Sequence, residues 1–205
     1  MRKINKLTPL PNFNGHNYNT DCKIWSCKKC TDITFHNKYK NIYEDTRWQI
    51  LIDEQNQLCG YTELYIENLE ESHIDHYKKR EHFPNLTFDW NNLVVATKDN
   101  IFGANYKDSN YKIEENEYSS IFNPVIDNVE NYFYYDKFGM IREDKGKVEK
   151  TVEIFNLNHS LLKFKRKEII DMIEFFKNDD LSKDEIQIQL EPYGLTSVLN
   201  QYLKE

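Results

Sequence analysis

Residues 72–77 read Ser-His-Ile-Asp-His-Tyr, and residues 83–93 read Phe-Pro-Asn-Leu-Thr-Phe-Asp-Trp-Asn-Asn-Leu. In the first stretch, Ile74 and His76 alternate with His73 and Asp75, which predicts a short strand. Side chains two residues apart on a strand share a face, so His73 and Asp75 lie on one face and His76 on the other. A twist or bulge at a strand end can still aim adjacent side chains at one centre.

The residues around this centre predict mainly helices. Asp89 or Asn91 is a suitable N-cap for a helix that begins in the second stretch and continues to Ala96. Further helices are predicted at 38–57, at 158–178, after the capping box formed by Ser182 and Glu185, and at 196–203. Short strands are predicted at 64–66 and 152–157, a hairpin with Gly139 at its turn over 132–142, and a polar loop over 99–120.

The predicted fold class is therefore α+β, with a small central ββα unit embedded in a mainly helical domain. We expect residues 1–37 to form an irregular basic arm and residues 38–110 to hold a helix and the central unit. Residues 111–205 are expected to form the hairpin and the C-terminal helices, which dock a partner.

The charge of the chain restricts its partners. It carries 27 Lys and Arg residues against 34 Asp and Glu residues. The basic residues exceed the acidic ones only in the first 50 positions. An acidic protein is unsuited to coat long nucleic acids, but a local basic patch can hold phosphates. There is no Walker A motif for nucleotide binding, no secretory signal and no apolar run near the ~20 residues that span a bilayer. We expect a cytoplasmic protein that has no membrane partner.

Three cysteines lie close together near the N-terminus, at Cys22, Cys27 and Cys30, with His36 nearby. They could form a zinc knuckle or remain reduced thiols in a cytosolic segment. Their spacing leaves both alternatives open.

A carboxylate next to an imidazole, as in Asp75 and His76, is what metal-assisted hydrolysis of a phosphodiester requires. The carboxylate can hold a divalent cation, and the neutral imidazole can take a proton from the attacking water. An amide oxygen, such as that of Asn92, could fix the orientation of the ring. These residues also have ordinary structural interpretations, as hydrogen-bonded strand histidines, a cap carboxylate and an N-cap.

His73-Ile74-Asp75-His76, followed by Asn92-Leu93, resembles the ββα-metal core of HNH endonucleases. More narrowly, the chain resembles the PtuB family of HNH nuclease subunits from Septu and retron-associated anti-phage systems. The resemblance extends from residue 1 to about residue 175. It is carried in order by Arg2-Lys3-Ile4-Asn5-Lys6, Glu54-Gln55, Leu58-Cys59-Gly60-Tyr61, Phe83-Pro84, Phe88-Asp89, Asn123-Pro124, Tyr132-Phe133, Gly139, Asn156-Leu157-Asn158, Leu161 and Arg166.

The resemblance implies a metal-dependent endonuclease that hydrolyses phosphodiester bonds of duplex DNA from phage or host. It also implies a hetero-oligomer with a PtuA-like ABC-type ATPase subunit. By position, His76 resembles the general base, Asp75 the metal ligand beside it and Asn92 the residue that orients the base. His73 matches the first histidine of the tetrad and is a further catalytic candidate.

The resemblance implies Mg²⁺ or Mn²⁺ as the cation, because the ligands are hard oxygens. Candidates for the last metal ligand are Asn100 and Asn105. Four basic residues are expected to bind backbone phosphates: Lys78, Lys79, Arg80 and Lys107. The three consecutive ones could equally form a solvated loop.

The chain departs from the family at the structural zinc site. Cys59 is present, but Thr62 and Thr97 stand where further cysteines are expected. One thiol cannot make a tetrahedral zinc site, so we predict no structural Zn²⁺ there. This departure leaves two alternatives open: a catalytically inactive HNH-scaffold subunit of the same kind of complex, and a free-standing nucleic-acid-binding domain that uses the basic arm.

Overall fold

The computed structural model describes residues 1–16, 42–142 and 146–204. At its centre lie two antiparallel strands, β1 (Ser72–His76) and β2 (Leu93–Thr97), which pair so that His76 faces Leu93. The short helix α3 (Gly103–Asn105) follows and continues into the π-helix Tyr106–Tyr111. The order is thus strand, strand, helix, and the α+β class is confirmed.

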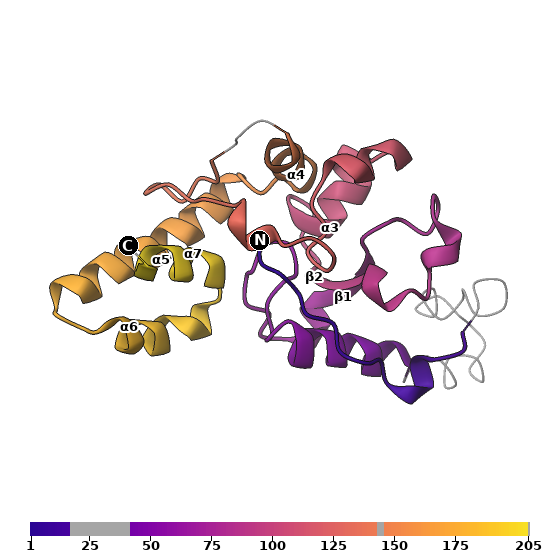
Figure 1. Ribbon diagram of the computed structural model, residues 1–205, viewed down its shortest axis with the longest axis horizontal. Helices are drawn as coiled ribbons and strands as arrows, with labels where there is room; N and C mark the ends of the chain where they lie inside the picture. Colours follow the sequence, from indigo (N-terminus) through magenta and orange to yellow (C-terminus); the bar gives the residue numbers. More distant parts are fainter. Residues whose placement is uncertain (17–41, 143–145, 205) are drawn as a thin grey trace.

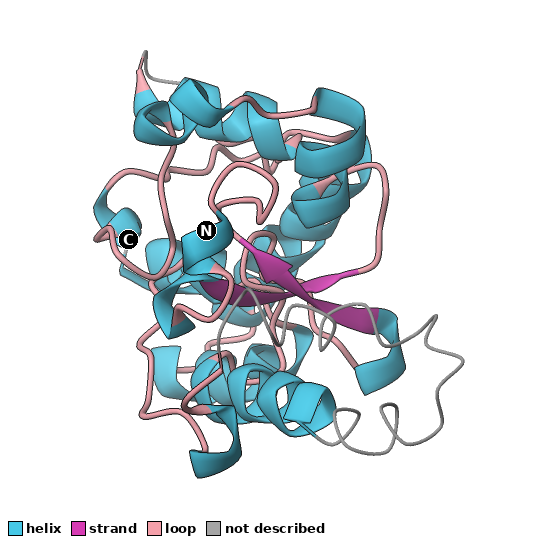
Figure 2. Ribbon diagram, turned by 90° about the vertical axis from the view of Figure 1, so that its right-hand side faces the viewer, coloured by secondary structure: helices cyan, strands magenta, loops and turns pink. Residues whose placement is uncertain are grey.

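Helices surround the two strands on several sides (Figure 2). They are a helix over 42–48 that continues as the π-helix Gln49–Glu54, α4 (Lys147–Phe155), α5 (Ser160–Asn178), α6 (Lys183–Leu190) and α7 (Thr196–Lys204). Single 3₁₀ turns or short 3₁₀ helices occur at Pro11–Phe13, Leu69–Glu71, Pro84–Leu86, Trp90–Asn92, Glu115–Ser120, Val129–Asn131 and Glu191–Tyr193. Figure 1 shows α5, α6 and α7 grouped at one end of the molecule, away from the strands.

Strand β2 occupies the stretch for which the sequence predicted a helix. Asp89 is a cap, as predicted, and its side chain accepts a hydrogen bond from the backbone N–H of Asn91. The helix that it caps is only the 3₁₀ turn Trp90–Asn92, and the chain then extends. Val94 and Val95 are fully buried. Branched side chains pack well on a pleated surface buried on both faces, so tertiary packing outweighs the helical interpretation.

Two other local predictions were wrong. The segment 152–157 is not a strand, because most of it belongs to α4, which buries Val148, Val152 and Phe155 at helical spacing. The polar stretch 99–120 is not a loop, since it contains α3, the π-helix and a 3₁₀ helix. The expected strand at 64–66 is reduced to isolated bridges that Leu64 and Tyr65 form.

The C-terminal predictions are largely confirmed. Helix α5 covers the predicted segment, the Ser182–Glu185 capping box starts α6, and α7 follows as expected. The predicted hairpin is a tight turn with a single bridge, and Gly139 there has a φ of +75°. A Cβ at Gly139 would lie 2.2 Å from the carbonyl oxygen of Lys163, so only glycine lets this turn approach α5 so closely.

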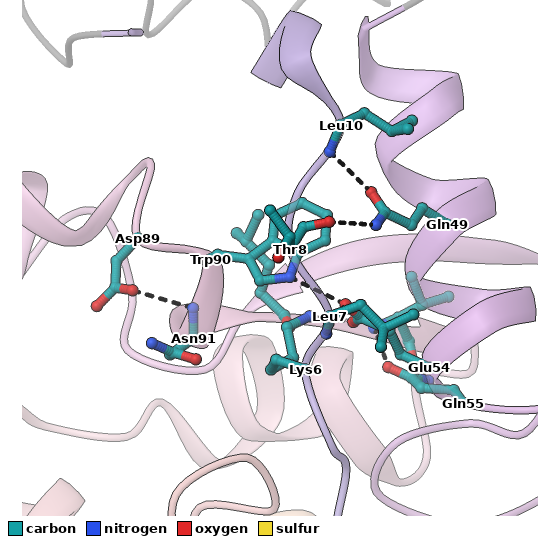
Figure 3. A network of polar contacts seen from close by, with 12 residues as sticks. Lys6, Leu7, Thr8, Leu10, Gln49, Glu54, Gln55, Asp89, Trp90 and Asn91 are labelled. Carbon is teal, nitrogen blue, oxygen red and sulfur yellow. Dashed lines mark hydrogen bonds and ion pairs between the residues drawn. The ribbon is translucent and has the colours of Figure 1, made fainter. Parts of the chain in front are cut away.

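Residues 1–16 of the predicted arm are irregular, as expected, but they are packed against the domain. Ile4 and Phe13 are buried. The ammonium of Lys6 lies 2.6 Å from Oε2 of Glu54, and the indole N–H of Trp90 donates to Oε1 of the same carboxylate at 2.9 Å (Figure 3). This ion pair neutralises the charge of Lys6. Lys6 therefore does not support the alternative that the chain is a free-standing nucleic-acid-binding domain that uses the basic arm. The rest of the arm, including Cys22, Cys27 and Cys30, lies outside the described residues.

The buried apolar side chains form one continuous cluster, in which Val94, Val95 and Ala96 of β2 are fully buried. Strand β2 packs beside α3 and the π-helix Gln49–Glu54. In the described parts of the chain, no helix combines the length and the apolar character needed to cross a bilayer.

Candidate active site

A cavity of about 690 Å³ opens beside the end of β1 and the π-helix Tyr106–Tyr111. Its lining is rich in ionisable side chains, among them His73, Asp75, His76, Lys79, Arg80 and Asp108. The structure therefore brings together both histidines and the aspartate of the tetrad with two of the basic residues that follow it.

His76 is the last residue of β1 and is only 8% exposed. Its Nε2 lies 3.0 Å from the carbonyl oxygen of Thr87. A carbonyl can only accept, so Nε2 carries the hydrogen and the neutral ring has its lone pair on Nδ1. Burial, helped by the positive charge of Arg80, lowers the pKa of His76 to about 4. The imidazole is therefore neutral at pH 7, the form that a general base requires.

Asn92 has a different partner from the one the sequence predicted. Its Oδ1 accepts from the backbone N–H of Lys78 at 2.8 Å, and its Nδ2 donates to the carbonyl oxygens of Lys78 and Leu86 at 3.0 and 3.1 Å. The Asn92 side chain, at the end of the loop between β1 and β2, is thus bonded to Lys78 at the start of the loop and to Leu86 within it. Because Leu86 precedes Thr87, Asn92 positions His76 through this backbone and not by direct contact with the ring.

Asp75 is buried in a network that the sequence did not predict. Its Oδ2 accepts from the hydroxyl of Tyr61 at 2.5 Å and lies 3.1 Å from Nζ of Lys107. Burial alone would raise the pKa of Asp75, but Lys107, His73 and the Tyr61 hydrogen bond together lower it. The carboxylate is therefore ionised and already paired with a cation of the chain itself.

Lys107 cannot bind phosphate as it lies, so that prediction is corrected. Its side chain is 0% exposed. The ammonium lies 3.1 Å from Oδ1 of Asp108 and donates to the backbone carbonyls of His76 and Tyr77 at 3.2 and 3.1 Å. An unpaired buried ammonium would be very costly, and these oxygens compensate for its desolvation.

Asp108 shares the Lys107 charge with Asp75. Burial, with the nearby negative charge of Asp75, raises the pKa of Asp108 to about 6. Lys79 approaches from the other side, with its ammonium 3.8 Å from Oδ1 of Asp108 and bonded to the Asp108 carbonyl at 3.1 Å. Carboxylates and ammonium groups therefore alternate from Asp75 through Lys107 and Asp108 to Lys79.

Of the two side chains predicted to complete a metal site with Asp75, Asn105 lines the same cavity as Asp75, and Asn100 is not among the residues that line it. The amide of Asn105 donates to the carbonyl of Lys98 at 2.9 Å and to Oδ1 of Asn100 at 3.2 Å. Oδ2 of Asp75 is engaged by Lys107 and Tyr61. Among the described residues, no group of three or more His, Cys, Asp or Glu side chains is arranged to hold a metal ion. As they lie, these residues do not fit a resident Mg²⁺ or Mn²⁺.

Cys59, Thr62 and Thr97 stand where the family resemblance implies a structural zinc site. Cys59 is a buried free thiol, and the hydroxyl of Thr97 lies 3.9 Å from its sulfur. Thr62 is buried as well. A hydroxyl does not replace a thiolate as a zinc ligand.

The predicted phosphate-binding residues divide into two groups. Lys79 and Arg80 line the cavity, whereas the ammonium of Lys78 lies 4.8 Å from the ring centre of Phe83. Sequence reasoning missed Tyr61 and Asp108 as site residues. Tyr61 stood in a quoted motif, but nothing local indicates that its hydroxyl reaches Asp75.

Searches with protein-family models and among curated proteins found no match to this chain.

Proposed function

We propose that this chain is an HNH-type endonuclease that hydrolyses DNA phosphodiester bonds in the cavity beside β1. The observation that carries the proposal is the state of His76. The ring is held by Thr87 in one tautomer, is neutral at pH 7 and lines a cavity whose rim includes Lys79 and Arg80. A preoriented neutral base next to two cations suits attack of water on a phosphate.

The proposed reaction uses these groups in fixed roles. A water molecule in the cavity gives a proton to Nδ1 of His76 and attacks the phosphorus. The bond to one ester oxygen breaks, and that oxygen leaves as an alcohol after it takes a proton from solvent water, while the imidazolium returns its proton to solvent. Lys79 and Arg80 bind the non-bridging oxygens, where negative charge develops. Asn92 is a positioning residue, because it holds the loop that carries Thr87.

The wider role in this proposal rests on the family resemblance. The chain would act in the cytoplasm as the effector nuclease of an anti-phage hetero-oligomer with a PtuA-like ABC-type ATPase subunit. The acidic excess beyond residue 50 suits a surface that docks a partner better than one that binds DNA. The ATPase would supply the nucleotide sensing, since this chain has no Walker A motif.

A second candidate is a catalytically inactive HNH-scaffold subunit of such a complex. The contact between Lys107 and Asp75 favours it, because the carboxylate expected to bind a metal is engaged by a lysine. The two candidates make opposite predictions about cleavage.

Cleavage of supercoiled plasmid tests the proposal. Wild type, His76→Ala and the matched control His159→Ala are compared with Mg²⁺, with Mn²⁺ and with EDTA. His159 caps α5 and is not among the residues that line the cavity. We expect nicking by wild type and His159→Ala and none by His76→Ala. Equal cleavage by all three would contradict the role of His76.

If wild type does not cut in any of these conditions, the assay is repeated with the ATPase subunit bound. Cleavage that then depends on His76 supports the nuclease. Its absence, with the complex intact, supports the inactive scaffold.

A further inference from the structure

We propose that the ammonium group of Lys107 takes the place of a divalent cation at Asp75, so that the native chain does not bind Mg²⁺ or Mn²⁺ there. The part of this inference that concerns the reaction rests on the proposed function. The part that concerns metal binding can be tested without a cleavage assay.

The oxygens around the ammonium form a site suited to a cation. Asp75 and Asp108 each place a carboxylate oxygen 3.1 Å from Nζ, and the carbonyls of His76 and Tyr77 lie at 3.2 and 3.1 Å. Two carboxylates and two carbonyls are the hard oxygen donors that Mg²⁺, Ca²⁺ and Mn²⁺ prefer. Here the ammonium of Lys107 lies within 3.2 Å of all four oxygens.

Burial and these contacts fix the position of the Lys107 side chain. Its side chain is 0% exposed, and it comes from the π-helix Tyr106–Tyr111, which lies against the end of β1. Burial alone would lower the pKa of Lys107, but Asp75 and Asp108 raise it, so the group stays charged. A divalent ion at Oδ2 of Asp75 would face this charge at close range, and the two cations would repel each other.

The contacts also give Lys107 a role near the chemistry. It bonds to the backbone carbonyl of His76 itself, so it ties the end of β1 to the helix. Lys107 is therefore a positioning residue for His76. The charge that orders this corner of the cavity belongs to the protein, and no dissociable ion is needed for that purpose.

Binding of Mn²⁺ to the full chain tests the inference. The concentration of free Mn²⁺ is measured by electron paramagnetic resonance. The variants are Lys107→Ala, Asp75→Asn, Lys107→Ala with Asp75→Asn, and the control Lys165→Ala, which removes an exposed lysine of α5. We expect wild type, Asp75→Asn and Lys165→Ala to bind Mn²⁺ equally weakly. Lys107→Ala is expected to bind it at least tenfold more tightly, and the double variant to lose that gain.

Two results would overturn the inference. One is Mn²⁺ binding by wild type that Asp75→Asn abolishes, since the metal would then displace or accompany Lys107. The other is no gain in Lys107→Ala, since the four oxygens would then not form a cation site. If Lys107→Ala does not fold in buffer, Mn²⁺ is expected to restore its thermal transition, and failure to restore it counts against the inference.

The cleavage assay separates this inference from the proposed function. Nicking by wild type that persists in EDTA supports the replacement of the metal in the reaction, whereas nicking abolished by EDTA contradicts it. If neither the chain alone nor its complex with the ATPase subunit cleaves DNA, the proposed nuclease fails, while the Mn²⁺ measurements still decide whether Lys107 replaces a metal.

Discussion

Nζ of Lys107 lies 3.1 Å from Oδ2 of Asp75, and neither side chain is more than 5% exposed. The pair joins the helix after β2 to β1, next to the histidine that we propose as the general base. Buried pairs contribute little net stability compared with apolar packing, but the loss of one partner leaves a buried charge without compensation. The energetics of this corner therefore depend on both residues together.

Lys107→Ala is expected to lower the free energy of unfolding by about 3–5 kcal/mol, because Asp75 would keep a buried charge without its cation. Lys79→Ala is the control, since its pair with Asp108 is longer and partly exposed, and we expect a loss below about 1 kcal/mol. Urea denaturation measures both. Addition of Asp75→Asn to Lys107→Ala should recover part of the loss, and equal losses for the two lysine variants would contradict the buried pair.

Tyr61→Phe is expected to cost about 1–3 kcal/mol, because Asp75 would lose a buried hydrogen-bond donor. No cavity should form, since the ring stacks on Phe155 with centroids 4.5 Å apart. The matched control is Tyr65→Phe, whose hydroxyl contacts Gln57 at the surface, and we expect almost no change there. Thermal denaturation of both variants checks this. A similar melting temperature for the two would show that the Tyr61 hydroxyl contributes nothing.

The low pKa of His76 predicts the pH dependence of both stability and activity. Burial depresses the pKa in the folded state to about 4, below its ordinary value of about 6.5. The stability linked to this group is therefore complete above about pH 6.5 and is lost as the pH falls through about 4. The acid limb of kcat/KM for cleavage is likewise expected near pH 4.

Titration of the His76 ring by NMR measures this pKa directly, and His76→Gln should remove its share of the pH dependence of unfolding. A midpoint near 6.5 would contradict the buried neutral imidazole.

Asn92→Ala is expected to cost about 1–3 kcal/mol and to reduce cleavage, because three backbone groups of the loop would lose their amide partner. Asn91→Ala provides a control one residue away, since the Asn91 side chain is exposed. Chemical denaturation and plasmid nicking are measured together. If Asn92→Ala nicks as fast as Asn91→Ala, the loop does not need this clamp to position His76.

Arg80→Ala is expected to weaken DNA binding. It should also make the slope of log K against the logarithm of the salt concentration less steep by about 0.9, the contribution of one phosphate contact. Lys165→Ala removes a positive charge from the exposed face of α5 and should leave the slope unchanged. Fluorescence anisotropy with duplex DNA at several salt concentrations gives both slopes. An unchanged slope for Arg80→Ala would exclude a phosphate contact at this residue.

Local patterns predicted the elements whose formation depends on neighbours in the chain. The alternation at 72–77 predicted β1, and the Ser182–Glu185 capping box predicted α6. The same reasoning failed at β2, where Val94 stands in an apolar run too short to distinguish strand from helix, and at α4, where the short segment around Val152 mixes apolar and polar residues. Packing against the rest of the core decided those two elements.

For the candidate site, the sequence by itself determined that Asp75 and His76 are adjacent at the end of a strand, because adjacency and alternation are local properties. Only the tertiary structure decided the partners of these side chains. Tyr61, Thr87 and Lys107 reach them from three separate segments. Buried polar groups must find partners wherever the fold places donors and acceptors, and spacing along the chain does not specify which segment supplies them.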